Sequence, residues 1–176
     1  MNTTAANFRG SLSWQPLTIF AIYRLVVALL LAVSALFSEP DGLLGAVQPG
    51  RFTMVALVYA AVAVVLLVTS LQRVPAFGLQ VSAGIVGDIV AISALSYTLG
   101  GQQASLGVLL VAAVAGASLL TGVRLGAFFA ALATVALLAT ESLEQLANRG
   151  GADGYTQVAV LGIAIFATSL TAALLA

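Results

Sequence analysis

The sequence predicts an all-α membrane protein, folded as a six-helix transmembrane bundle. Of its 176 residues, 61% are hydrophobic and 7% are charged, whereas soluble domains average about 25% charged residues. The apolar residues form six continuous blocks of 18 to 21 residues, and a membrane-spanning helix needs roughly 17–25. A membrane β-barrel would instead show apolar and polar residues in alternation, so strands are excluded.

The elements are predicted in chain order from these blocks and from the turn-forming residues between them. The predicted helices occupy residues 17–37, 52–71, 81–99, 104–121, 123–140 and 158–176. Residues 1–16 are predicted to be a tail that precedes the six-span domain of residues 17–176. Pro16 suits the first turn of a helix, where its missing N–H is not needed. The short connections between the central blocks predict antiparallel neighbours.

The distribution of arginine predicts that both termini are cytoplasmic. One side of the predicted bundle has three arginines and no acidic residue, and the other has two arginines and five acidic residues. The first side carries Arg9, Arg73 and Arg124, and the second carries Glu39, Asp41, Arg51, Glu141, Glu144, Arg149 and Asp153. Because arginine in short loops favours the cytoplasm, the first side, which holds both termini, is predicted to be inside.

The absence of two residue types narrows the possible chemistry. The sequence has no histidine and no cysteine, so zinc sites, thiolate nucleophiles, Ser-His-Asp triads and a phosphate-accepting histidine are excluded. No catalytic residue, metal or cofactor is expected in this stretch of chain. The formal net charge is zero, which leaves no basic patch for nucleic acid. Membrane lipid is the expected surrounding.

Two ionisable residues lie inside predicted spans. Arg24 and Asp88 each lie seven residues beyond the start of their block, and a charge at mid-membrane costs about 2.5–3.5 kcal/mol on insertion scales. Arg24 could extend to the interface, and Asp88 could contact a Ser or Tyr hydroxyl or form a functional site. At matched depth the two could neutralise each other, so we predict that helices one and three are neighbours and that Arg24 and Asp88 form an ion pair.

Small residues concentrate in the third and fourth blocks. Gly84 and Gly87 lie in the third, and Ala112 and Gly116 are spaced four apart in the fourth. Small side chains allow helices to approach closely in lipid. These four positions are therefore candidates for packing within the bundle, for a dimer face, or for contact with the transmembrane helix of another protein.

Several short segments, taken in order, resemble one family. They are Tyr23-Arg24-Leu25, Gly87-Asp88-Ile89, Tyr97-Thr98-Leu99-Gly100-Gly101, Ser105-Leu106-Gly107, Leu110-Val111-Ala112-Ala113-Val114-Ala115, Leu120-Thr121-Gly122-Val123-Arg124 and Gly154-Tyr155-Thr156-Gln157. Together they resemble the membrane region of PilS-type sensor histidine kinases, which act in two-component systems that control pilin expression for type IV pili. The resemblance extends from Tyr23 to Leu170.

The resemblance implies a location, partners and a mode of action. It implies a bacterial inner-membrane homodimer that monitors the transmembrane helix of pilin and signals through helix six. It also implies an NtrC-like response regulator and cytoplasmic kinase domains, which this sequence does not contain. We therefore expect this stretch to be a membrane sensor that does not itself catalyse, within an ATP-dependent protein-histidine kinase.

Two other functions remain open on the sequence alone. One is a small transporter or channel, although such proteins tend to have repeated halves and broken helices, and here only helices one and three carry interior charges. The other is a membrane assembly factor without a signalling role. A flux assay in liposomes separates transport from the rest.

Overall fold

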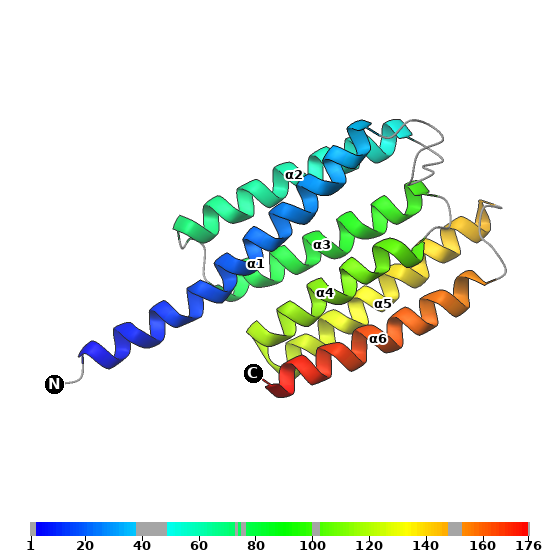
Figure 1. Cartoon of the computed structure of the whole chain (residues 1–176). Helices are drawn as coiled ribbons and strands as arrows, with labels where there is room; N and C mark the ends of the chain where they lie inside the picture. The colour runs from blue at the N-terminus through cyan, green and yellow to red at the C-terminus, as the bar shows by residue number, and fades with distance from the viewer. Residues whose placement is uncertain are drawn as a thin grey trace.

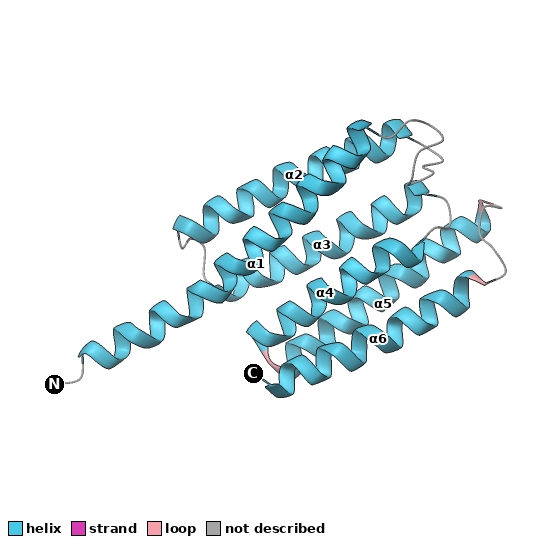
Figure 2. Cartoon of the chain, viewed as in Figure 1, coloured by secondary structure: helices cyan, strands magenta, loops and turns pink. Residues whose placement is uncertain are grey.

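The computed structural model describes residues 3–37, 49–72, 74, 77–99, 103–147 and 153–175, with side chains from residue 16 in the first helix and from residue 106 in the fourth. Within these ranges the chain consists of helices and short turns, with no strand (Figure 2). Part of the predicted orientation depends on the side chains of Arg9, Glu39, Asp41, Arg73 and Arg149, which lie outside the described residues.

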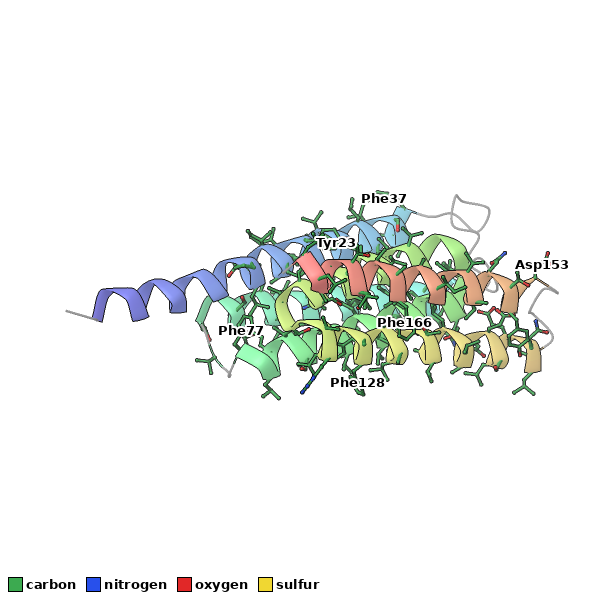
Figure 3. The ribbon with its side chains drawn as sticks, turned by 90° about the horizontal axis from the view of Figure 1, so that it is seen from below. Tyr23, Phe37, Phe77, Phe128, Asp153 and Phe166 are labelled. Atoms are coloured by element: carbon green, nitrogen blue, oxygen red, sulfur yellow. The ribbon has the colours of Figure 1, made fainter. Side chains whose placement is uncertain are left out.

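Six long helices make up the described fold. They are α1 (Thr3–Phe37), α2 (Pro49–Gln72), α3 (Phe77–Leu99), α4 (Gln103–Thr121), α5 (Val123–Leu146) and α6 (Gly154–Leu175). Five of them are long and apolar enough to cross a membrane, and the apolar part described for α4, Leu106–Thr121, is shorter. Phe37 and Phe128 point away from the bundle (Figure 3) and are 82% and 59% exposed, as expected for side chains that face lipid.

Several helices extend beyond the apolar blocks. α1 begins at Thr3, inside the segment expected to be a tail, and continues through Pro16. α2 begins at Pro49 and α3 at Phe77, ahead of the predicted starts. Hydrophobicity marks the part of a helix that lies in lipid, whereas backbone hydrogen bonding continues into the polar interface, so apolar blocks underestimate helix length.

A further difference concerns the end of α5. Glu141 and Glu144 follow the predicted end of the fifth helix at residue 140, but in the structure they lie in the last turns of α5 and are 1% and 0% exposed. Glu141 accepts a hydrogen bond from Gln145 Nε2 at 3.0 Å. Its carboxylate lies where Gly154, the first residue of α6, lacks a side chain. The interior of this half of the protein therefore contains carboxylates that the block boundaries hid.

Consecutive helices run in opposite directions, so α1 begins and α6 finishes at one end of the bundle, here called the terminal end. Figure 1 shows the first turns of α1 extending beyond this end. α1 packs mainly against α2 and touches α4 lightly, and α2 packs against α3. The helices α3, α4 and α5 pack on one another, and α6 packs on α4 and α5. The fold is thus an α1–α2 hairpin set against a four-helix unit, α3–α6.

Candidate functional site

A buried polar cluster joins the hairpin to the four-helix unit. Arg24 comes from α1, Tyr59 from α2 and Asp88 from α3, and they are 5%, 5% and 2% exposed. The Arg24 Nε lies 2.7 Å from Asp88 Oδ1 and donates to Oδ2 at 2.9 Å, while Nη2 donates to the same Oδ2 at 2.8 Å. The Tyr59 hydroxyl donates to Oδ1 at 2.9 Å. Both carboxylate oxygens of Asp88 are therefore occupied.

The glycine at position 84 gives the guanidinium its space. Gly84 lies one turn before Asp88 on α3, and a Cβ built on it would lie 2.5 Å from Arg24 Nη1 and 3.0 Å from Cζ. Carbon atoms do not approach nitrogen so closely without displacement, so a side chain at position 84 would push the guanidinium away. Gly84 is one of the predicted small positions. The space left by its missing side chain, here called a notch, is filled by the Arg24 guanidinium.

A second notch accommodates Phe20, one turn before Arg24 on α1. A Cβ at Gly116 on α4 would lie 2.6 Å from Phe20 Cε2, so the ring occupies the space that this glycine leaves. The Arg24 Cζ lies 5.0 Å from the centre of the same ring, within range of a cation–π interaction. The ring of Tyr23 stacks near it, with centroids 6.3 Å apart. Phe20 therefore contacts both the charged cluster and α4.

The electrostatics of the cluster indicate that it stabilises the packing of α1, α2 and α3. A lone charge in hydrocarbon is costly, and an ion pair offsets that cost only when its geometry is good and its remaining hydrogen-bonding groups are satisfied. Asp88 meets this condition with three hydrogen bonds from two other helices. The cluster is neutral overall and holds α1, α2 and α3 at one level of the bundle.

The other two predicted small positions are less enclosed. Nothing lies within 4 Å of a Cβ built on Gly87, which is half-buried on α3. Ala112 on α4 is exposed. Of the four candidates, Gly84 and Gly116 are thus filled from α1, whereas Gly87 and Ala112 are open toward the surroundings of the protein.

Tyr59 and Phe20 were not singled out from the sequence. A hydroxyl partner for Asp88 was expected without naming the residue. The presence of Tyr59 inside an apolar block is a signal, but Tyr23 lies inside another block at a similar depth, so the sequence does not decide between them. Phe20 gave no such signal. One phenylalanine among many apolar residues looks the same whether it faces lipid or a glycine notch.

A smaller polar contact lies near the terminal end of the four-helix unit. The hydroxyls of Ser118 on α4 and Ser169 on α6 are 2.7 Å apart and buried. Gly126 on α5 makes room for them, since its Cβ would lie 2.6 Å from Ser118 Oγ. Within the described residues no group of three or more His, Cys, Asp or Glu side chains could hold a metal ion.

Comparison with known proteins identifies the domain. The family described as the PilS-like transmembrane domain matches residues 7–176. The curated protein "Sensor protein kinase PilS" of Pseudomonas aeruginosa is 31% identical over 157 residues, which are 88% of this chain and 29% of that protein. The chain therefore spans less than a third of this relative's length. No solved structure matches the chain. Since the family match covers nearly all of the sequence, this chain belongs to the PilS-like transmembrane domain family and is a multi-pass protein of the bacterial inner membrane.

Proposed function

We propose that this chain is the membrane input domain of a two-component sensor histidine kinase. The observation that carries the proposal is the family match over residues 7–176, together with a relative named as a sensor protein kinase. The relative is more than three times longer than the matched segment, which leaves room for kinase domains after a membrane domain of this size. In this proposal the chain senses, and an ATP-dependent histidine kinase elsewhere in the same protein catalyses.

The proposal requires a defined orientation. We place the terminal end of the bundle in the cytoplasm, so that α6 can continue into a cytoplasmic domain. Arg124, in the first turn of α5, lies at this end, and Arg51, Glu141 and Glu144 lie at the other. A topology reporter fused at either end of the chain tests this orientation. Alkaline phosphatase is suitable because it is active only outside the cytoplasm, so both fusions are expected to be inactive.

The ligand in this proposal is the transmembrane helix of pilin, and the response-regulator partner is NtrC-like. Gly84 and Gly116 are poor candidates for the pilin contact because Arg24 and Phe20 already fill their notches. Gly87 on α3 and Ala112 on α4 remain open, and a small residue at a lipid-facing position lets a second helix approach closely. We therefore place the pilin contact at one or both of these positions in a homodimeric receptor.

In-membrane crosslinking between this domain and pilin tests the contact. Gly87→Leu or Ala112→Leu is expected to reduce crosslinking, because the larger side chain holds the pilin helix away. Gly50→Leu is the matched control, since Gly50 is also open, with nothing within 4 Å of its Cβ, but lies on α2. Unchanged crosslinking in both variants would remove pilin contact from these faces.

The kinase assignment has a separate test. The protein that contains this chain is expected to have a phosphoacceptor histidine and ATP-binding motifs after residue 176. We expect the purified longer protein to phosphorylate itself with ATP as the phosphate donor. A protein without these motifs that moves solutes across liposomes would instead favour the transporter alternative, and one that does neither would favour an assembly factor.

A further inference from the structure

The contact between the hairpin and the four-helix unit differs from the contacts inside each unit. Inside the four-helix unit, small residues bring backbones together, as where Thr134 packs into the space at Gly162 and Leu161 into the space at Gly107. Between the units, α1 touches α4 only lightly. The Arg24 ion pair with Asp88 connects α1 to α3, and the Phe20 ring at Gly116 connects α1 to α4. The described contacts that hold α1 against α3 and α4, as distinct from its packing on α2, are therefore few and specific.

The α2 side of the same boundary is held separately. Gln80 on α3 is buried, and its Nε2 donates to the Leu66 carbonyl oxygen at 3.2 Å and to Thr69 Oγ1 at 3.1 Å, both on α2. Tyr59 on α2 also donates to Asp88. If the contacts of α1 separate, these contacts still hold α2 on α3. The boundary thus has one side, along α2 and α3, that is joined by side-chain hydrogen bonds, and another side, between α1 and α4, that has few contacts.

A groove lies on the side with few contacts. It has a volume of about 440 Å³ and lies between α1 and α4, lined by Pro16, Ile19, Phe20, Tyr23, Gly116, Leu119 and Leu120. Phe20 lines this groove and also lies beneath the Arg24 guanidinium. Moving the ring out of the Gly116 notch removes a contact from α4 and a supporting face from the guanidinium in one step.

We propose that Arg24, Phe20 and their two glycine notches form a two-position switch that sets the distance of α1 from the four-helix unit. In the closed position the ring fills the Gly116 notch and the guanidinium fills the Gly84 notch beside Asp88. In the open position α1 separates from α4 and Arg24 turns toward the terminal end. Arg24 lies eight residues beyond Pro16, about 12 Å along the helix, and arginine near a span end extends its charge to the interface. The switch is a property of this membrane domain and does not depend on the proposed kinase function.

Distance measurements between spin labels test the switch in the intact chain in lipid nanodiscs. The sequence has no cysteine, so labels attach only where cysteine is introduced. Ile22→Cys on α1 with Phe128→Cys on α5 reports the distance between units, and both positions are exposed and outside the groove. Ile22→Cys with Val65→Cys on α2 is the control pair inside the hairpin.

The glycine variants give the expected results. Gly84→Ala and Gly116→Ala each place a methyl group in an occupied notch, and each is expected to add a longer distance between α1 and α5. Phe20→Ala is expected to add the same population without a steric clash. Gly78→Ala, also on α3 and with nothing within 4 Å of its Cβ, is expected to match the unmodified protein. The hairpin pair is expected to stay unchanged throughout.

Coupling between the two notches is tested in an Asp88→Asn background. There the ion pair is already lost, so Gly116→Ala is expected to add no further long-distance population. Three outcomes overturn the proposal. One is an unchanged distance in Gly84→Ala, Gly116→Ala and Phe20→Ala alike, and another is an equal change in the hairpin pair, which signifies loosening of the whole bundle. The third is full additivity of Asp88→Asn and Gly116→Ala.

Discussion

The Arg24 guanidinium on α1 pairs with the Asp88 carboxylate on α3 at 2.7 Å, although α1 packs mainly against α2. The contact between these two helices therefore depends on a long side chain that reaches across, with Gly84 leaving space for its end. Since the pair is buried among apolar helices, either partner alone would be a charge without compensation. This relationship underlies most of the predictions that follow.

A double-mutant cycle measures the coupling between Arg24 and Asp88. We expect Arg24→Ala and Asp88→Ala each to lower the free energy of unfolding by about 3–5 kcal/mol, because each leaves one buried charge unpaired. The double variant is expected to cost less than the sum. Unfolding in mixed micelles with increasing SDS, followed by circular dichroism, provides the measurement. Strict additivity would mean that the two side chains do not interact.

The two glycines of α3 are predicted to differ in their tolerance of a methyl group. Gly84→Ala is expected to destabilise by about 1–3 kcal/mol, as overpacking does, because its Cβ meets the Arg24 guanidinium. Gly87→Ala is expected to stay within about 0.5 kcal/mol of the unmodified protein. The same unfolding titration compares them, and equal effects would contradict the notch at position 84.

The Tyr59 hydroxyl is predicted to contribute through its hydrogen bond to Asp88. Tyr59→Phe is expected to lower the free energy of unfolding by about 1–2 kcal/mol. The charged acceptor strengthens this hydrogen bond, but side-chain hydrogen bonds between membrane helices contribute less to stability than the apolar surroundings would suggest. Tyr155→Phe is the control, because Tyr155 is 47% exposed at the start of α6. In an Asp88→Ala background the effect of Tyr59→Phe should disappear, and its persistence there would assign the hydroxyl to another partner.

The proximity of α4 and α6 is predicted from the serine pair. In this cysteine-free chain, Ser118→Cys with Ser169→Cys is expected to form a disulfide on mild oxidation, because the two hydroxyl oxygens are 2.7 Å apart. The crosslinked form is read from its mobility on a non-reducing gel. Thr168→Cys replaces Ser169→Cys in the control, since the Thr168 hydroxyl bonds to Ala164 within its own helix. Crosslinking as efficient in the control would show that the contact lacks specificity.

Signal output is predicted to depend on the rotation of α6. If the proposed function holds, inserting one to three residues after Ala176 in the longer protein is expected to change kinase output with a helical period. Each inserted residue turns the following helix by about 100°. Autophosphorylation in isolated membranes is the readout. Output that falls steadily with insertion length, or ignores it, would indicate a flexible connection.

The sequence alone determined the fold class and the six helices, and it predicted the charged pair among other possibilities. Continuous apolar blocks of bilayer length have few alternatives, because every backbone polar group in lipid must be satisfied within a helix or a closed barrel. Two opposite charges inside such blocks stabilise each other, because each one alone would be costly in lipid. The pairing of Arg24 with Asp88 could therefore be predicted from the sequence. The depth argument was less accurate. The candidate membrane spans begin at Pro16 and Phe77, so Arg24 lies eight residues and Asp88 eleven residues into its span. This difference of three residues is about 4.5 Å along the helix axis, which the arginine side chain spans.

Only the tertiary structure decided which helices touch and which small residues are already filled. In Gly84, Gly87, Ala112 and Gly116 the sequence shows four similar positions, but two hold side chains from α1 and two are open. It also left Glu141 outside the bundle, where the structure buries it against Gly154. The physical reason is that hydrophobicity and helix formation are local, whereas a notch is defined by a side chain from a distant part of the chain. Such complementarity exists only once the helices have packed.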